Sequence, residues 1–216
     1  RLADFDGVSL YPSAMNRMEG FLKGKPKIIE NFEPEKYDGY FIKIKITDVG
    51  KWYNFPLISF KDENGVRQFT NDCVGREIFV DKTYLEDIVN FQQVKYEFIQ
   101  GYYFDEGRNP KINSVIQHLF NTRLHYKKLK NPIQMIFKEL MNSSYGKSYL
   151  KPIDTETEYI KKDEGEKYID RNYNYIKEFI TLPNGNFKVK KIKTINDHFN
   201  NAQVGVEILS MSKRIM

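Results

Sequence analysis

Two aspartates near the start of the chain stand where carboxylates could do chemistry. Asp4 and Asp6 lie two positions apart in residues 1–6, whose residue types predict a short strand, and Gly7 follows them. A carboxylate at the end of a strand can hold a divalent metal ion, and the backbone amides after it can receive phosphate oxygens. The alternative is a strand end with two solvated carboxylates, followed by a helix cap rich in serine.

A second group of polar side chains falls at helical spacing. Lys138, Asn142 and Tyr145 are four and three positions apart, so on a helix they share one face, separate from the apolar positions. A cation, an amide and an aromatic ring on one face can grip a triphosphate and stack against a base. Gly146 would let a nucleic-acid strand approach the backbone closely. The alternative is an amphipathic helix with ordinary solvated polar residues.

Two helices joined as a hairpin are predicted to position this second group. Asn109-Pro110 and Asn131-Pro132 each place a capping residue before a proline, which is typical of a helix start. Apolar residues then recur at helical spacing. They are Ile112, Val115, Ile116, Leu119, Phe120 and Leu124 in the first helix, and Ile133, Ile136, Phe137, Leu140 and Met141 in the second. A similar pattern from Val204 predicts a helix at the end of the chain.

The segments on either side of this hairpin carry strand patterns. Apolar and polar residues alternate over residues 40–47, and Asn64-Gly65 and Asn184-Gly185 are each typical of a hairpin turn. We expect strands at 57–60, 66–69, 77–80, 94–104, 178–182 and 187–192, with a further helix at 84–91. Residues 150–200 are polar and rich in Tyr, Lys and Asp, so this segment has the character of an insertion.

The composition narrows the classes of function. The net charge is +5, and residues 111–150 hold seven Lys or Arg against the single Glu139, which indicates an anionic partner for this stretch. Cys73 is the one cysteine, which excludes a disulfide framework, and the three histidines show no metal-ligand spacing. No apolar run approaches the length of a membrane span. The chain begins without Met and ends within a helical pattern, so we expect it to be part of a longer protein.

The two groups of residues together resemble motifs of the B-family DNA polymerases, most closely the protein-primed branch of viruses and linear plasmids. Asp6-x-x-Ser9-Leu10-Tyr11-Pro12 is similar to motif A of that family. Lys138-x-x-x-Asn142-Ser143-x-Tyr145-Gly146 is similar to motif B, and both match at every defining position. Their order and their separation also fit the family, and the resemblance spans the whole chain.

The resemblance implies an α+β fold. It would be a partial polymerase palm, an antiparallel sheet with helices, joined to a fingers element made of an α-helical hairpin and to strand-rich insertions. The implied divisions are palm with motif A at 1–19, palm with a first insertion at 20–107, fingers with motif B at 108–149, a second insertion at 150–200 and a truncated palm helix at 201–216. In that branch the first insertion contacts the terminal protein that primes synthesis, and the second encircles DNA.

The resemblance also implies catalytic and nucleotide-binding roles. Asp6, with the carbonyl of Gly7, would coordinate the catalytic pair of Mg²⁺ ions, and Lys138 would bind the triphosphate and protonate the leaving pyrophosphate. Ser9 and the backbone of Leu10 would touch the triphosphate. Tyr11 would lie under the sugar and exclude a 2′-hydroxyl, and Asn142 and Tyr145 would form the pocket for the nascent base pair.

Further residues are implied to contact DNA. Gly146 and Lys147 would lie close to the template strand beside Ser143, and Arg123, Lys127 or Lys130 could add a second phosphate contact. Ser210-Met-Ser-Lys213-Arg214 occupies the place of a Thr-x-x-Gly/Ala-Arg motif that contacts primer-template DNA in that branch. Here Ser replaces Thr and Lys replaces the small residue, and Ser210 and Arg214 share a helix face.

The function implied is part of a DNA-directed DNA polymerase that adds dNTPs to a primer 3′-hydroxyl by two-metal phosphoryl transfer, in protein-primed replication of a viral or plasmid genome inside a cell. The partners implied are primer-template DNA, dNTPs and a terminal protein, with no membrane. These residues lack a Tyr-x-Asp-Thr-Asp run, which carries the second catalytic aspartate in that family, so we expect the fragment alone to be inactive. Two alternatives remain. One is a non-catalytic nucleic-acid-binding module built on the basic helices; the other is a metal-dependent nuclease using Asp4 and Asp6, which leaves Lys138 to Tyr145 unexplained.

Overall fold

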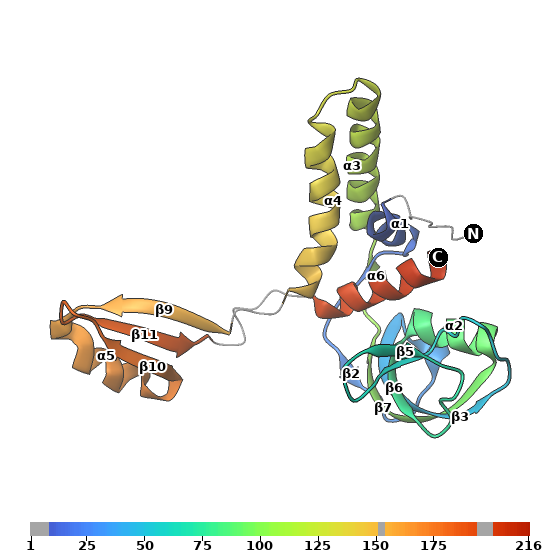
Figure 1. Ribbon diagram of the computed structural model, residues 1–216, viewed down its shortest axis with the longest axis horizontal. Coiled ribbons are helices and arrows are strands. Elements are labelled where there is room, and N and C mark those ends of the chain that lie inside the picture. The colour runs from blue at the N-terminus through green and yellow to red at the C-terminus, as the bar shows by residue number, and fades with distance from the viewer. Residues whose placement is uncertain (1–8, 151–153, 194–200) are drawn as a thin grey trace. The chain divides into compact units, whose positions relative to one another are not determined.

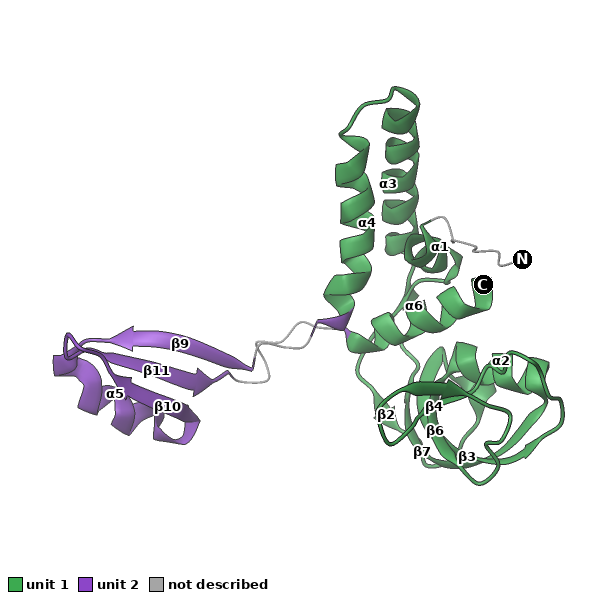
Figure 2. Ribbon diagram, in the orientation of Figure 1, with its two compact units in different colours: residues 1–148, 202–216 green, residues 149–201 purple. Residues whose placement is uncertain are grey.

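The computed structural model describes residues 9–150, 154–193 and 201–216. The strand predicted at 1–6, with Asp4, Asp6 and Gly7, lies outside these described residues. The described part is α+β, with antiparallel sheets and helices, as expected from the sequence (Figure 1). It forms two compact units, one of residues 1–148 with 202–216 and the other of residues 149–201 (Figure 2).

A four-stranded antiparallel sheet forms one half of the larger unit, in the order β2 (Lys27–Ile28), β7 (Val94–Phe104), β3 (Gly39–Val49), β6 (Glu77–Asp81). The alternation predicted for β3 is confirmed, because Ile42, Ile44 and Ile46 are fully buried while Lys45 is exposed. Helix α2 (Lys82–Gln92) packs Leu85 and Ile88 into the same core.

Smaller elements complete this half of the unit. Strands β4 (Ser59–Lys61) and β5 (Arg67–Phe69) form the hairpin predicted at Asn64-Gly65, although each strand is shorter than expected. The carboxylate of Asp62 accepts hydrogen bonds from the backbone N–H groups of Asn64 and Val66 and so helps to stabilise the turn. A short 3-10 helix, η1, spans Pro34–Lys36.

Four helices form the other half of the larger unit. Helices α1 (Leu10–Arg17), α3 (Lys111–Lys128) and α6 (Ala202–Ile215) share a core of Ala14, Met15, Met18, Ile116, Val204 and Ile208. Strands β1 (Phe21–Leu22) and β8 (Arg108–Asn109) pair beside them. Helix α4 (Gln134–Tyr149) completes the predicted helical hairpin with α3, and Tyr126 stacks on Phe137 across it with ring centroids 5.6 Å apart.

Two features of α4 differ from the sequence expectation. The helix begins at Gln134, because Lys130 is left-handed (φ 54°) and the side chain of Asn131 accepts a hydrogen bond from the N–H of Ile133. Its apolar positions are also not uniformly buried: Met141 is enclosed, whereas Ile136 and Leu140 are 57% and 48% exposed. Helical periodicity identified the helix, but it did not reveal which apolar positions find partners within these residues.

The smaller unit is a three-stranded antiparallel sheet in the order β10 (Ile176–Thr181), β11 (Phe187–Ile192), β9 (Thr155–Ile160). The hairpin predicted at Asn184-Gly185 joins β10 to β11. Helix α5 (Gly165–Asn172) and two 3-10 helices, η2 (Lys162–Glu164) and η3 (Tyr173–Tyr175), complete the unit. Its range is close to the 150–200 segment set apart by composition, and the assignment of that segment as the second insertion stays a prediction.

Strand β9 and helix α5 were not predicted because their residues are mostly polar. Strand β9 is held on β11 by the amine of Lys191, which pairs with Glu156 and Glu158. Helix α5 is held on β9 by the hydroxyl of Tyr168, which donates to Glu158 at 2.6 Å. These two carboxylates raise the pKa of Lys191 well above its ordinary value. No helix within the described ranges is long and apolar enough to cross a membrane.

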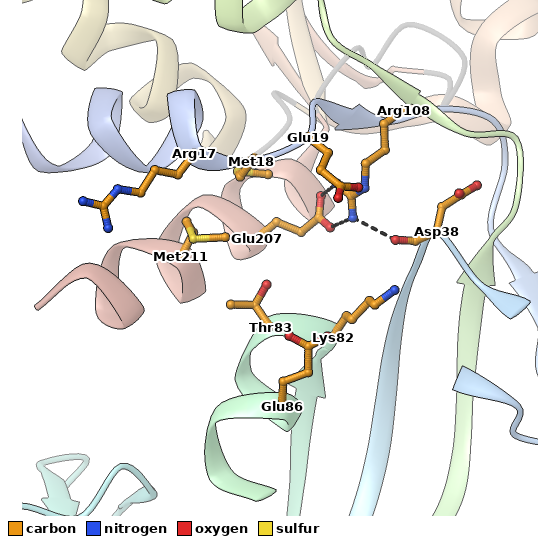
Figure 3. Close-up of a pocket in the computed structure, with 10 residues that line it drawn as sticks. All are labelled: Arg17, Met18, Glu19, Asp38, Lys82, Thr83, Glu86, Arg108, Glu207 and Met211. Carbon is orange, nitrogen blue, oxygen red and sulfur yellow. Dashed lines mark hydrogen bonds and ion pairs between the residues drawn. The ribbon is translucent and has the colours of Figure 1, made fainter. Parts of the chain in front are cut away.

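Polar contacts connect the two halves of the larger unit across one face of α6. Arg108, which pairs with Glu207 at 2.7 Å, donates to the carbonyl of Asp38 at 2.9 Å. The hydroxyl of Ser210 donates to Asp81 at 2.6 Å, and Arg214 pairs with Asp87 at 2.8 Å. A cavity of about 340 Å³ opens along this seam, and the Arg108–Glu207 pair lies in its wall (Figure 3). Because a neighbouring face of α6 is apolar, this helix contributes to the helical core through its apolar face and bonds the sheet half through its polar face.

Asp81 is the most deeply buried of these carboxyl groups and should make stability depend on pH. It is 2% exposed, its Oδ2 has no hydrogen-bond partner in the described part of the chain, and burial raises its pKa to about 6. Because the pKa is about 3.9 in an unfolded chain, the ionised form opposes folding. The folded state therefore loses stability as the pH rises from about 4 through about 6, and no more is lost from this group above that range.

Asp81→Asn removes the ionisable group. We therefore expect its effect on the free energy of unfolding to be about 1–3 kcal/mol more stabilising at pH 8 than at pH 4.5. Urea denaturation of the chain at the two pH values measures this difference. Asp170→Asn, at an exposed position of α5, is the matched control. An equal effect of Asp81→Asn at both pH values would contradict the assignment.

Candidate nucleotide-binding site

Helix α1 begins at the predicted motif A residues in an unusual conformation. Ser9 is left-handed (φ 49°, ψ 52°), a conformation that costs a residue with a side chain about 1 kcal/mol or more. Its carbonyl accepts the N–H of Ser13 at 2.9 Å and starts the helix, but its hydroxyl makes no capping bond. The Ser9 hydroxyl instead accepts a hydrogen bond from Nη1 of Arg123 on α3, at 2.7 Å. This bond helps to offset the cost of the left-handed conformation.

The two tyrosines predicted to bind the nucleotide are brought into contact. The ring of Tyr11 on α1 stacks on the ring of Tyr145 on α4, with centroids 4.0 Å apart and planes 13° from parallel. Both rings are half-buried and pack against the core that α1, α3 and α6 share. An aromatic surface therefore lies where the start of α1 faces α4.

Lys138 and Asn142 lie on the side of α4 that carries Tyr145. Both are half-buried, and neither side chain has a hydrogen-bond or ion-pair partner among residues 9–150, 154–193 and 201–216. A partly buried amine and amide with unused donors can bind an anionic or polar ligand, because such groups lose free energy when they stay unpaired.

The residues of α4 predicted to contact DNA lie on its exposed surface. Ser143, Gly146 and Lys147 are all exposed, and the hydroxyl of Ser143 donates to the carbonyl of Leu140 at 3.1 Å. A Cβ atom added to Gly146 would meet nothing within 4 Å. The surroundings of Gly146 therefore leave room for a polymer to approach, although nothing within this chain requires glycine there.

Ser210 and Arg214, also predicted to contact DNA, are bound by partners within the chain. Ser210 is 7% exposed and donates to Asp81, and Arg214 contacts Asp87, Glu86 and the carbonyl of Thr83. These contacts favour a structural role in joining α6 to α2. Contact of either residue with DNA stays a prediction.

Three basic residues of α3 and of the turn after it were candidates for a second phosphate contact, and the structure separates them. Arg123 donates a hydrogen bond to Ser9, whereas Lys127 and Lys130 are exposed near the turn that joins α3 to α4. The Nε of Arg123 is buried without a hydrogen-bond partner in the described part of the chain. Asn113, which bonds the end of α1, was not identified from the sequence because an isolated asparagine in a helix gives no signal of its partner.

The predicted metal ligands Asp6 and Gly7 lie outside the described residues. Within residues 9–150, 154–193 and 201–216, no group of three or more His, Cys, Asp or Glu side chains could hold a metal ion. The proposed metal ligands therefore rest on the sequence pattern. The described part of the site consists of Ser9, Tyr11, Arg123 and the side of α4 that carries Lys138, Asn142 and Tyr145.

The structure thus places α1, which begins at the motif A residues, against the helical hairpin that carries the motif B residues, within an α+β fold. The chain belongs to the family of type B DNA polymerases, organellar and viral, whose family model matches residues 2–216. It is 26% identical over 220 residues to a protein of Ascobolus immersus described as "Probable DNA polymerase", a match that covers 98% of this chain and 17% of that protein.

Solved structures of phi29 DNA polymerase have a similar fold. The complex with primer-template DNA and incoming nucleotide substrates superposes with a TM-score of 0.56 at 19% identity, covering 95% of this chain and 33% of that one. An orthorhombic crystal form gives a TM-score of 0.50 at 16% identity, with coverages of 94% and 32%. The chain thus spans about a sixth of the Ascobolus protein and a third of phi29 DNA polymerase.

Proposed function

We propose that these residues form the incoming-nucleotide site of a DNA polymerase, and that the whole protein adds dNTPs to a primer 3′-hydroxyl. The observation that carries the proposal is the stacking of Tyr11 on Tyr145. These residues lie far apart in the sequence, one in each motif, and the resemblance to the family implies that both touch the nucleotide.

Each side chain of the site binds the part of the nucleotide that suits its chemistry. Tyr11 packs beneath the sugar and leaves no room for a 2′-hydroxyl, and Tyr145 and Asn142 line the base. Lys138 binds the triphosphate and donates a proton to the leaving pyrophosphate. The phosphates also approach the start of α1, where the positive end of the helix dipole, the Ser9 hydroxyl and Arg123 favour negative charge.

Asp6 and the carbonyl of Gly7 are proposed to hold Mg²⁺. Carboxylate and carbonyl oxygens are the hard ligands that this ion takes. When bound, the metal ions would neutralise phosphate charge and activate the primer hydroxyl. The second carboxylate of the pair would come from a part of the protein outside these 216 residues.

We further propose priming by a terminal protein, in replication of a viral or linear-plasmid genome within a cell. Support comes from membership of an organellar and viral family and from the two segments, 20–107 and 150–200, that resemble the insertions of the protein-primed branch. Covalent labelling of a protein by a radioactive dNTP without any oligonucleotide primer would test this priming mode.

Primer extension tests the main proposal. The longest natural chain containing these residues is incubated with a primed template, Mg²⁺ and dNTPs, and template-directed elongation is expected. Degradation of DNA without any need for dNTPs would favour the metal-dependent nuclease instead. DNA binding with neither reaction would favour the non-catalytic binding module.

Lys138→Gln is expected to raise the KM for dNTP by roughly 10–100-fold, since a hydrogen bond to a charged group contributes about 1.5–3 kcal/mol. Steady-state kinetics over a series of dNTP concentrations measures the change. Lys128→Gln, on the exposed surface of α3, removes the same charge and serves as control. An unchanged KM in Lys138→Gln would remove this residue from the triphosphate site.

A further inference from the structure

Helix α3 holds both ends of the short helix α1. At the start of α1, Nη1 of Arg123 donates to the Ser9 hydroxyl at 2.7 Å. At its end, Nδ2 of Asn113 donates to the carbonyl of Met18 at 2.7 Å and to that of Asn16 at 3.2 Å. The last carbonyls of a helix have no partners within the helix, and a side-chain amide can satisfy them.

The orientation of the Asn113 amide follows from these contacts. Its Oδ1 is buried without a hydrogen-bond partner in the described part of the chain. The reverse orientation would place that oxygen against two carbonyl oxygens, which repel it, and would leave the two carbonyls without this donor. An unpaired Oδ1 is therefore tolerated so that both N–H groups can bond α1.

Apolar packing between α1 and α3 leaves the position of α1 incompletely specified. Ile116 of α3 packs with Ala14 and Met15 of α1 in the shared core. Beside this contact a cavity of about 100 Å³ remains, lined by Pro12, Ser13, Asn16, Ile116, Gln117 and Phe120. Because packing contacts are non-directional and part of this interface is open, the directional bonds at the two ends add to the packing of α1 on α3 and α6 in setting where α1 lies along α3.

Resting on the nucleotide site proposed above, we propose that Asn113 is a positioning residue of that site. It acts through α1, holding the end of the helix so that Tyr11 keeps its place beneath the sugar. Met18 lies nine positions after Ser9, a helical rise of about 13 Å, so Asn113 lies at the other end of α1 from the nucleotide. Substitution of Arg123 would not test positioning alone, because Arg123 could also bind phosphate directly.

Asn113→Asp tests the proposal, because it keeps the shape of the side chain and replaces its two N–H donors by oxygen. The matched control is Asn121→Asp on the same helix. Asn121 is exposed, and its Oδ1 accepts a hydrogen bond from Gln117, which aspartate can also accept. Should Asn113→Asp prevent folding, Asn113→Ala removes the same donors without adding charge and is measured instead.

The first measurement is amide hydrogen exchange on this chain. Asn113→Asp is expected to speed exchange of the α1 amides of residues 14–18 by about tenfold or more relative to the control, with the four-stranded sheet unchanged. Unchanged exchange in α1 would overturn the inference whether or not the protein is a polymerase.

The second measurement is sugar selection by the longest natural chain. Asn113→Asp is expected to lower the ratio of kcat/KM for dNTP to that for the ribonucleotide by about tenfold, since small misplacements of binding groups can cost up to about 100-fold. A loss of folded protein would not alter this ratio, because both substrates report on the same active molecules. An unchanged ratio in an active variant would overturn the inference alone, whereas an inactive unsubstituted chain would overturn the proposed function itself.

Discussion

Asp6→Asn should lower the rate of nucleotide incorporation by more than about 100-fold, because even residues that only support a metal ligand cost about 10–100-fold when replaced. The change keeps the size of the side chain and removes the negative charge that would hold Mg²⁺. Affinity for primer-template DNA should change little, since Asp6 is not among the proposed DNA contacts. Primer extension for incorporation and fluorescence anisotropy for DNA binding, on the longest natural chain, measure the two effects separately.

Asp4→Asn is the control that separates the candidate functions. The resemblance to motif A requires Asp6 and does not require Asp4, so a polymerase should retain most of its activity in Asp4→Asn. A nuclease that uses both carboxylates would lose its activity with either change. If Asp6→Asn left incorporation intact, the proposed metal site would be wrong.

Tyr11→Val is the second change with a large expected effect. Removing the ring would open space beneath the sugar, so the preference for dNTP over the ribonucleotide should fall by at least about tenfold, the effect of adding or removing small groups in a binding pocket. Tyr11→Phe keeps the ring and should preserve the preference. Competitive incorporation of matched dNTP and rNTP pairs measures the ratio directly.

Because Tyr11 also stacks on Tyr145, the valine variant needs a second control. Tyr145→Leu removes the other ring of the stack and should weaken nucleotide binding, while sugar selection by Tyr11 is largely kept. If both variants lost sugar selection equally, the stack as a whole would control the sugar, and the assignment to Tyr11 alone would be wrong.

Most of the secondary structure could be predicted because its signals are local. The capping pairs Asn109-Pro110 and Asn131-Pro132 predicted the starts of α3 and α4. The alternation of apolar and polar residues predicted β3. These patterns follow from backbone geometry and the side-chain periods of helix and strand. Strand β9 and helix α5 were missed because they are short and mostly polar, and their contacts with β11 and with each other are not visible in the sequence.

For the proposed site, too, the local part could be predicted from the sequence and the contacts between distant segments could not. Helical spacing placed Lys138, Asn142 and Tyr145 on one face of α4 from the sequence alone. That Tyr11 stacks on this face, and that Arg123 bonds Ser9, depended on how α1 and the hairpin pack together. A residue type at a given spacing indicates the chemistry available, whereas its partner is set by packing between distant segments.

The sequence by itself determined the family, the two motifs and the helices that carry them, because all three are properties of short stretches of chain. Only the tertiary structure decided that Ser210 and Arg214 are engaged by α2 and β6 and that Asn113 holds the end of α1. These contacts join residues about 100 or more positions apart. A polar side chain can bond many different partners, so its actual partner is chosen by the long-range packing of apolar cores rather than by its neighbours in sequence.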